Sequence, residues 1–517
     1  MSPIDQLLEL HAMSRPAAFA VLPALVLVVF AIVTLLADLL ELGSSRGPAE
    51  GQAGPTIMAP WLAMTGTAIA FGAVVWQWLR LEEEAGLYFN GMIALDGFAV
   101  FLTGVVVAAT LLTLLLTVGY SRRHNVDLAE YYHLILMAAV GMVLLVEAAN
   151  LVMVFLGLEV MSVSVYILTG FRRTQLRSIE GALKYFVLGA FSTGFFVYGI
   201  AMVYGTTGTM DLAEIGTRIA TGPPAPLLLA GVGLLVIGFG FKVALVPFHM
   251  WSPDVYEGAP TPITGFMATG VKAAGFAAFV RVFLSTFDAL ADQWVPVLWV
   301  LAVLTMLVGN VAAIRQDDVK RMLAYSSIAH AGYLVVAMVA HNALGTAAVL
   351  YYLAAYTAMT VGAFGVAVTL SGRGAERTSI SRDYAGLGYS EPLLAAAMAV
   401  FMFSLTGVPP TAGFVGKFYI ISAAVDAGHV PLAVLLVVAS VISAYYYLKV
   451  VVAMYMTSPS SAGSDAGPTH AHLGALASTA ILATVVAVLG MGIFPGEWID
   501  MARASVEGLA TAAARLP

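Results

Sequence analysis

The sequence predicts an all-α membrane protein of about fourteen transmembrane helices, with two inverted repeats of five helices each. Three observations predict this class: 60% of the 517 residues are hydrophobic, 10% are charged, and long apolar stretches recur along the chain. Soluble domains carry roughly 25% charged residues, so water is not the main solvent of this chain. A bilayer core about 30 Å thick requires about 20 apolar residues in a helix.

Fourteen stretches of the sequence meet this length. The first of them is too long for a cleaved signal peptide and lacks a basic leader. We expect spans at residues 16–42, 57–80, 97–118, 131–147, 151–169, 183–204, 227–251, 262–286, 295–313, 319–340, 343–370, 392–425, 430–456 and 474–494.

The stretch 131–169 allows either one long helix or two shorter ones. Arg122 and Arg123 precede it, and Arg172, Arg173 and Arg177 follow it. Two spans place all five cations on one side of the membrane, as the positive-inside rule requires, whereas one span would divide them. We therefore expect two spans.

Basic residues outside the spans favour one side of the membrane. With both termini in the periplasm, twelve of them lie on the cytoplasmic side and five on the outer side, so we predict that orientation. The cytoplasmic set is Arg46, Arg122, Arg123, Arg172, Arg173, Arg177, Arg315, Lys320, Arg321, Arg373, Arg377 and Arg382; the outer set is Arg15, Arg80, Arg218, Arg503 and Arg515.

The order of spans divides the chain into four parts. Residues 1–130 hold helices 1–3, residues 131–286 the first repeat (helices 4–8), residues 295–456 the second (helices 9–13), and residues 457–517 a loop, helix 14 and a short tail. The loop 457–473 is rich in Ser, Gly and His, which is typical of a flexible segment. Its His470 and His472 allow metal binding, but a solvated loop is the favoured interpretation, and we expect no metal site.

The composition excludes several classes of function. The chain contains no cysteine, so it has no disulfide, no thiolate zinc site and no Cys-ligated iron–sulfur cluster of its own. The net charge of −7, without a basic patch, gives no indication of nucleic-acid binding. If the protein belongs to a redox machine, the electrons travel through other subunits.

Four ionisable residues lie near the centres of predicted spans: Glu159, Lys242, Lys272 and Lys417. A charge at that depth costs at least about 2.5–3.5 kcal/mol. Burial and neighbouring positive charge both favour the neutral amine of a lysine, so a buried lysine can take up and release a proton. We expect these four residues to form a proton relay, with Glu159 favouring the charged form of a nearby lysine.

Other polar residues of the spans have a simpler interpretation. Lys184, Arg281 and Lys449 lie nearer span ends, where ion pairs or snorkelling to the interface explain them. Glu147 falls at the turn between two spans, where half-exposed carboxylates are ordinary. His330, in TyrSerSerIleAlaHisAlaGlyTyr, is the best histidine candidate for the relay, because neighbouring hydroxyls would support a water chain.

Two predicted spans are interrupted by proline. Pro247 breaks the seventh span close to Lys242, and Pro409 and Pro410 break the twelfth before Lys417. Continuous helix over 392–425 would also be about 51 Å long, too long to cross straight. Paired broken helices indicate ion sites in an inverted repeat.

A five-helix offset matches helices 4–8 with helices 9–13. It pairs Lys242 with Lys417, Lys272 with Lys449, and Glu159 with His330. Two half-channels, open to opposite sides and joined by a row of lysines, follow from this arrangement.

Two motifs carry a family resemblance over roughly residues 90–455. Residues 247–266, ProPheHisMetTrpSerProAspValTyrGluGlyAlaProThrProIleThrGlyPhe, and residues 317–333, AspAspValLysArgMetLeuAlaTyrSerSerIleAlaHisAlaGlyTyr, resemble the proton-conducting antiporter-like subunits of respiratory complex I. Within that family the sequence looks most like the N-type subunits, because Lys417 stands where the M-type has a glutamate and no long lateral helix follows the last span.

The resemblance implies a proton-translocating subunit of NADH–quinone oxidoreductase in a bacterial inner membrane. Glu159 would be its fifth-helix acid, Lys184 a sixth-helix lysine and Lys242 the seventh-helix lysine, with Lys272 and Lys417 the central and exit-side lysines. It further implies M-type and K-type neighbours, contact with the lateral helix of the L-type, and no cofactor in this chain. NADH, FMN, iron–sulfur clusters and quinone would reside in partner subunits.

Two alternatives share some of these features. A subunit of a multisubunit cation/proton antiporter or of a membrane-bound hydrogenase carries the same motifs. A stand-alone solute carrier belongs to a different class, but no span shows a clustered polar pocket apart from the lysine row. A structural scaffold would not require four charges within its spans.

Overall fold

The computed structural model describes residues 16–45, 56–371, 376, 378–457 and 474–514. Its elements in the first half are α2 (Leu22–Ser45), α3 (Met58–Leu79), α4 (Leu81–Glu84), β1 (Gly86–Tyr88), β2 (Ile93–Leu95), α5 (Gly97–Arg123), α6 (Ala129–Glu147), α7 (Leu151–Thr169), α8 (Leu176–Thr207), α9 (Leu212–Ile219), α10 (Pro226–Lys242), α11 (Trp251–Gly258), α12 (Thr261–Phe266), η1 (Met267–Val271), α13 (Lys272–Val280) and η2 (Arg281–Thr286). There follow η3 (Asp288–Leu290), α14 (Ala291–Ile314), α15 (Val319–Val339), α16 (Ala343–Leu370), α17 (Ile380–Asp383), α18 (Leu387–Ser390), α19 (Pro392–Thr406), α20 (Ala412–Asp426), α21 (Val430–Met456), α22 (Ala475–Ile493) and α23 (Pro495–Ala514).

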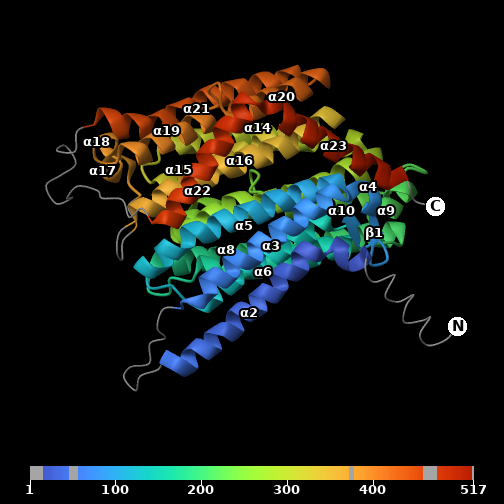
Figure 1. Cartoon of the computed structure of the whole chain (residues 1–517). Helices are drawn as coiled ribbons and strands as arrows, with labels where there is room; N and C mark the ends of the chain where they lie inside the picture. The colour runs from blue at the N-terminus through green and yellow to red at the C-terminus, as the bar shows by residue number, and fades with distance from the viewer. Residues whose placement is uncertain (1–15, 46–55, 372–375, 377, 458–473, 515–517) are drawn as a thin grey trace.

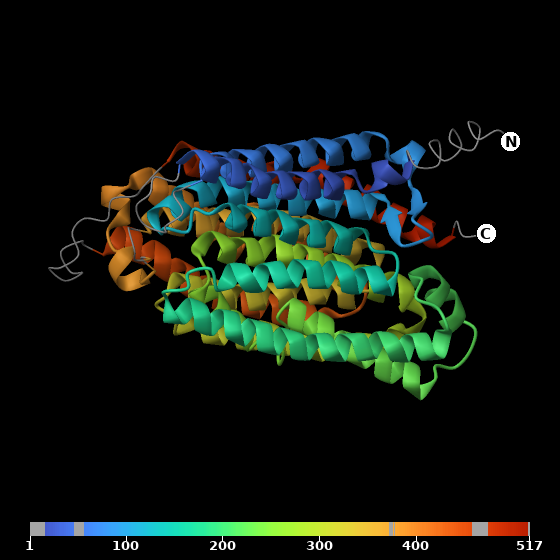
Figure 2. The same cartoon turned by 90° about the horizontal axis from the view of Figure 1, so that it is seen from below.

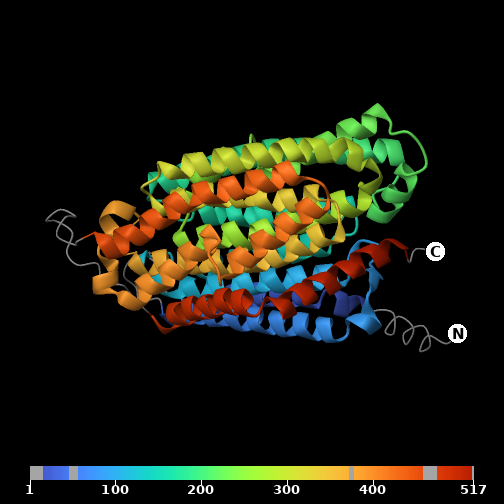
Figure 3. The same ribbon diagram turned by 90° about the horizontal axis from the view of Figure 1, so that it is seen from above.

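The long helices run side by side along one common direction (Figures 1, 2 and 3). One end of the bundle, which we call the β1 end, carries the antiparallel pair β1–β2, α9 and the last turns of α23. The opposite end, the α17 end, carries α17 and α18. At each end a backbone bridge joins two segments that connect the helices: Ile93 pairs with Ala148 at the β1 end, and Asp318 pairs with Ser379 at the α17 end.

Among the described residues, twelve helices are long and apolar enough to cross a membrane, and α10 and α19 are shorter apolar helices. These two are the interrupted spans, so the predicted set of fourteen and the all-α membrane fold are confirmed. The stretch 131–169 is two helices, as predicted. Asn150 ends the turn between them and caps α7, its side chain accepting a hydrogen bond from Val152 N at 2.9 Å.

The helices α6, α7, α8, α10–α11 and α12–α13 correspond to α14, α15, α16, α19–α20 and α21. In each group the first helix packs on the second, the second on the third, the third on both halves of the interrupted helix, and the first on the fifth. Because five helices separate equivalent members, equivalent helices run in opposite directions. This packing supports the predicted inverted repeat.

Glycines permit the closest helix crossing of each group. A Cβ atom added at Gly141 of α6 would lie 2.3 Å from Met161 N of α7, and one at Gly309 of α14 would lie 2.7 Å from Ala329 N of α15. Neither position has room for a larger residue. Close backbone approach at small residues is how helices associate in lipid, where apolar burial between helices supplies little.

Both interrupted helices break in the same way. After α10 the chain turns through Ala244, whose φ is +61°, and after α19 through Gly407, whose φ is +94°. Pro247 and Pro410 each stand three residues beyond these positions. The two lysines lie on opposite sides of their breaks, because Lys242 ends α10 and Lys417 belongs to α20.

Two features were not expected from the sequence. The span 262–286 is not a uniform α-helix: η1 and η2 are π-helical and flank α13, so Lys272 directly follows one π-helical segment and Arg281 begins the other. The tail after the last span contains α23, which packs on α5 and α16. The loop 458–473, with His470 and His472, lies outside the described residues.

A buried ion-pair network closes the α17 end. The Glu376 carboxylate, in the connection after α16, pairs with Arg172 Nη1 at 3.0 Å and with Lys320 Nζ at 2.6 Å. The Tyr120 hydroxyl also donates to it. Lys320 donates a further bond to Ala259 O at 2.6 Å. Glu376 therefore links the connection after α7, the start of α15 and the last turn of α5.

This environment holds the carboxyl group in its ionised form. Burial alone would raise the pKa of Glu376, but the positive charges of Lys320 and Arg172 outweigh burial and lower it to about 2. An unfolded glutamate has a pKa of about 4.3. Since the folded value is the lower one, the network's contribution to stability is complete above about pH 4.3 and is lost as the pH falls toward 2.

We predict that Glu376→Gln lowers the thermal unfolding temperature in detergent at neutral pH, because two buried cations lose their counter-charge. Breaking such a pair costs on the order of 3 kcal/mol. Glu82→Gln, a change at an exposed carboxylate of α4, is the matched control and should leave the unfolding temperature unchanged. Equal unfolding temperatures for the two variants would show that the network does not stabilise this end.

Candidate functional site

Five of the six predicted site residues lie on five different helices, and electrostatic or hydrogen-bonding contacts relate them to one another. They are Glu159 on α7, Lys242 on α10, Lys272 on α13, His330 on α15 and Lys417 on α20. The three lysines are 3–5% exposed and His330 is fully buried. Glu159 acts electrostatically on Lys242, and His330 lies within reach of the charges of both Lys272 and Lys417. We call these five residues the buried row.

Lys242 lies at one end of the row, beside Glu159. Its Nζ donates a hydrogen bond to Ser162 Oγ at 2.8 Å and lies 5.9 Å from the centre of the Tyr185 ring. Glu159 Oε1 accepts a bond from Thr193 Oγ1 at 2.8 Å. Glu159 is half-buried and shares the outward side of α7 with exposed apolar residues, so its carboxylate reaches from the row toward the surface of the bundle.

Lys272 occupies the centre of the row. Its Nζ donates to Ser327 O at 2.6 Å and also to Ser327 Oγ, both on α15. The Tyr356 ring lies 5.9 Å from the ammonium nitrogen, on its other side. All of these partners are neutral.

His330 lies between two tyrosine hydroxyls. Its Nδ1 lies 2.7 Å from the Tyr352 hydroxyl and its Nε2 lies 3.0 Å from the Tyr447 hydroxyl. The Tyr447 hydroxyl also bonds Ser326 Oγ. Hydroxyl and imidazole groups both donate and accept protons, so this chain of groups offers a path for proton transfer.

Lys417 is held at the end of a broken helix. Its Nζ donates to Leu405 O and Thr406 O, each at 2.9 Å, which are the last carbonyl groups of α19. A helix leaves its last carbonyl groups without partners and carries partial negative charge there. The Tyr333 ring, 5.0 Å from Nζ, covers another side of the ammonium group.

No ion pair involves Lys242, Lys272 or Lys417 in the part of the chain that the structure describes. A salt bridge would hold each amine in its charged form, whereas hydroxyl, carbonyl and ring partners leave both protonation states accessible. The buried row can therefore take up and release protons. In the same described region, no group of three or more His, Cys, Asp or Glu side chains is arranged to hold a metal ion.

Lys184, the sixth predicted residue, lies outside the buried row. It is partly exposed on α8 and pairs with Glu180 and with Asp254, each at 2.7 Å. Lys449, which the five-helix offset matches with Lys272, bonds Gln316 O at 2.9 Å near the α17 end. Both follow the ion-pair or interfacial interpretation that their positions near span ends indicate.

Sequence reasoning did not identify several polar partners of the row. Ser162, Tyr352 and Tyr447 each lie within hydrogen-bond distance of a row member. Ser327 stands in the motif that contains His330, where hydroxyls were expected to matter. The two tyrosines had no such signal, because the chain has 21 tyrosines and nothing in the sequence separates these two.

Comparisons with known proteins agree with this geometry. The family model described as NADH:quinone oxidoreductase/Mrp antiporter, TM, matches residues 148–443. Subunit N of NADH-quinone oxidoreductase from Trichlorobacter lovleyi is 47% identical, over 84% of this chain and 87% of that one. The subunit N of Salinibacter ruber is 43% identical, over 88% and 91% of the two chains.

Solved structures show the same fold. A chain of respiratory complex I from Thermus thermophilus, with bound aureothin, matches with a TM-score of 0.75 at 35% identity, over 92% of this chain and 98% of that one. A chain of the Mrp complex from Dietzia has a TM-score of 0.83 at 20% identity, over 97% of this chain and 100% of that one. At that identity the match supports the fold alone. From its matched motifs and its identity to these relatives, the chain belongs to the antiporter-like membrane subunits of NADH–quinone oxidoreductase, within the subunit N group.

Proposed function

We propose that this chain moves protons across the membrane through two half-channels joined by the buried row, driven by redox chemistry in other subunits of complex I. The observation that carries the proposal is that three lysines lie at bilayer depth on neutral partners, within the described residues. Placing an ammonium group at this depth costs several kcal/mol, and such groups are kept chiefly where they serve a function. Relatives named as subunits of NADH-quinone oxidoreductase supply the context of a proton pump.

Each half-channel uses one interrupted helix. Lys242 and Lys417 stand next to the two breaks, where non-helical backbone exposes polar groups inside the bundle. Lys272 and His330 join the two breaks, with Ser327, Tyr352 and Tyr447 as intermediate hydrogen-bonding groups. Glu159 sets the charge of Lys242: its approach favours the ammonium form, and its departure favours release of the proton.

The chain itself carries out no redox chemistry in this proposal. NADH, FMN, iron–sulfur clusters and quinone are held by partner subunits, and this chain contributes no cofactor ligand. The M-type and K-type subunits are its neighbours in the membrane, together with the lateral helix of the L-type. The outward-facing carboxylate of Glu159 and the exposed apolar surface of α7 and α8 suit contact with such a neighbour rather than with lipid alone.

The proposed orientation places the α17 end in the cytoplasm and the β1 end in the periplasm. At the α17 end lie Arg122, Arg123, Arg172, Arg173 and Arg177, which support it through the positive-inside rule. Water then reaches Lys242 from the cytoplasm and Lys417 from the periplasm, in the plasma membrane of a bacterium.

We predict that Lys272→Ala in the assembled complex abolishes most proton pumping and slows coupled quinone reduction, because the centre of the row loses its titratable group. Lys272→Arg should also impair pumping, since a guanidinium group does not release its proton. Lys449→Ala, a change at a lysine outside the row, is the matched control and should pump normally. Pumping is measured in inverted vesicles by a pH-sensitive dye, and normal pumping by Lys272→Ala would contradict the relay.

We predict that Gly407→Ala impairs pumping by displacing Lys417. The φ of Gly407 is +94°, which disfavours any residue with a Cβ atom, and that atom would lie 3.1 Å from Lys417 Cδ. Gly428→Ala is the matched control, because φ is +81° there and nothing lies within 4 Å of the added atom. Both variants carry backbone strain of roughly 1–3 kcal/mol, but Gly407→Ala alone changes the position of Lys417.

Pumping assays on both variants, normalised to the amount of assembled complex, separate strain from displacement. We expect Gly428→Ala to pump normally and Gly407→Ala to lose activity. Equal activity of the two variants would show that the position of Lys417 at the end of α19 is not required.

We predict opposite accessibility for two single cysteines, Thr174→Cys at the α17 end and Gly222→Cys at the β1 end. The chain has no native cysteine, so each thiol is a specific reporter, and both positions are exposed. A membrane-impermeant maleimide added to spheroplasts should label the thiol at position 222 and not the one at position 174, and inverted vesicles should reverse the result. The reverse pattern in spheroplasts would place the α17 end outside and overturn the orientation.

A further inference from the structure

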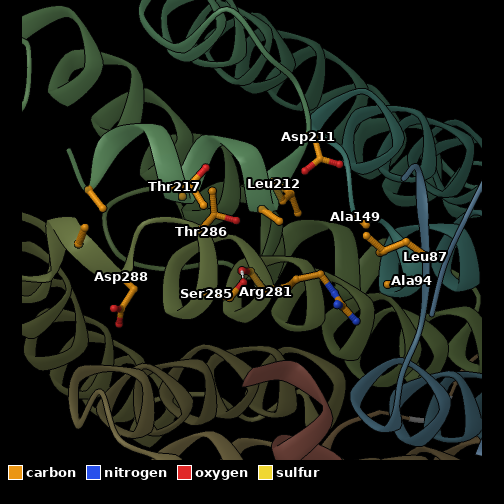
Figure 4. Close-up of a pocket in the computed structure, with 14 residues that line it drawn as sticks. Leu87, Ala94, Ala149, Asp211, Leu212, Thr217, Arg281, Ser285, Thr286 and Asp288 are labelled. Atoms are coloured by element: carbon orange, nitrogen blue, oxygen red, sulfur yellow. Dashed lines mark hydrogen bonds between the residues drawn. The ribbon is translucent and has the colours of Figure 1, made fainter. Parts of the chain in front are cut away.

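A cavity of about 290 Å³ opens at the β1 end, away from the buried row. Its rim includes the exposed Thr217, Ala220 and Asp288, and its floor includes the buried Arg281 and Thr286. Figure 4 shows the Arg281 side chain running along the cavity toward Ala94 and Leu87, with Asp211 and Asp288 at separate margins. A water molecule occupies about 30 Å³ in the liquid, so several waters fit between rim and floor.

Arg281 forms a bidentate ion pair with Asp96 next to this cavity. Its Nη1 lies 2.7 Å from Asp96 Oδ2, and its Nη2 lies 3.0 Å from Oδ1. Asp96 is also the N-cap of α5, where Oδ1 accepts a hydrogen bond from Ala99 N at 2.7 Å. The Asp96 carboxylate thus has a cation and a helix N-terminus as partners.

Glu147 brings a second carboxyl group to the same cation. It is the last residue of α6 and is 1% exposed. The half-exposed position that the sequence suggested for this carboxylate is therefore wrong. The next residue, Ala148, bridges to Ile93 near Asp96, and Ala149 lines the cavity. Glu147 lies within electrostatic reach of Arg281 and Asp96.

Three buried polar atoms of this cluster have no hydrogen-bond partner among the described residues: Glu147 Oε2, Arg281 Nε and Thr286 Oγ1. Buried polar atoms are ordinarily paired, and in a polar, roomy site the partner is water. Thr286 and Arg281 line the cavity, so the cavity extends from the surface of the bundle to the Arg281 side chain of this cluster.

The charges of the cluster decide the state of Glu147. One guanidinium group faces two carboxyl groups, and Asp96 already holds both of its Nη atoms. Of the residues that line the cavity, Asp211 and Asp288 are the acids, and they add negative charge at its margins. An ionised Glu147 would share the single positive charge of the guanidinium group with Asp96 and would otherwise have, among the described residues, only the neutral Thr103 nearby. Burial therefore stabilises Glu147 in its protonated form.

We propose that Glu147, Asp96 and Arg281 form a proton-binding site at the β1 end, in which Glu147 holds a proton that exchanges with the solvent through the cavity. Transfer is a simple acid–base step: the Glu147 O–H bond breaks as water in the cavity accepts the proton, and Arg281 then faces two carboxylates. The occupancy of this site does not depend on the buried row, whereas its use as a station in proton translocation rests on the proposed function.

The test is infrared spectroscopy of the assembled complex at neutral pH. A protonated carboxyl group absorbs as a C=O stretch, distinct from the bands of a carboxylate, and this stretch shifts in D2O when the proton exchanges. We expect one such band to be present in the wild type and lost in Glu147→Gln. We also expect its loss in Asp96→Asn, where asparagine keeps the N-cap but leaves Glu147 as the one carboxylate for Arg281.

The cavity is tested by Ala220→Trp, which fills its rim. We expect this variant to keep the band and to slow its shift in D2O, while Gly222→Trp, at an exposed position outside the cavity lining, keeps wild-type exchange. If no such band is lost in Glu147→Gln or in Asp96→Asn, the proposed site is wrong. If the two tryptophan variants exchange at equal rates, the cavity is not the route of exchange. If Glu147→Gln does not assemble, the Asp96→Asn spectrum carries the same test. These spectra report the protonation of Glu147 in the resting complex and test the proton-binding site alone. The pumping assay of Lys272→Ala tests the relay, so a negative result in one experiment is distinct from a negative result in the other.

Discussion

The fold depends on one constraint, namely that a bilayer offers no water to a charge or to an unpaired backbone group. Each lysine of the buried row satisfies it with neutral groups drawn from a different helix: Ser162 of α7 for Lys242, Ser327 of α15 for Lys272, and the end of α19 for Lys417. These hydrogen bonds join helices that are separate in the chain. The site and the architecture therefore have the same physical origin.

The most closely packed helix pairs do not carry the buried lysines. The pairs α6–α7 and α14–α15 cross at glycines so closely that an added Cβ would meet backbone. Lys242, Lys272 and Lys417 lie on α10, α13 and α20, outside these two tight pairs. At the α17 end Glu376 binds Arg172 and Lys320, which belong to different repeats. Glu376 thus ties the two repeats together at this end of the bundle.

Much of the fold was predictable because hydrophobic length and proline act locally. The broken spans followed from Pro247, Pro409 and Pro410, and the charge of the flanking arginines resolved 131–169 into two helices. The π-helical segments on either side of α13 have no comparable signal in the sequence. Glu147 was misjudged because its position at a turn is visible in the sequence, but β2, whose Ile93 bridges to the adjacent Ala148, is remote in the chain.

The hydrogen bonds of Lys417 to Leu405 O and Thr406 O have a consequence for hydration. Those two carbonyl groups end a helix inside the membrane, and leaving a buried polar group unpaired costs several kcal/mol. When the side chain of Lys417 turns away, another donor must replace it, and water is the small donor that can enter through a break in a helix. A movement of this lysine would therefore require water to enter its half of the bundle.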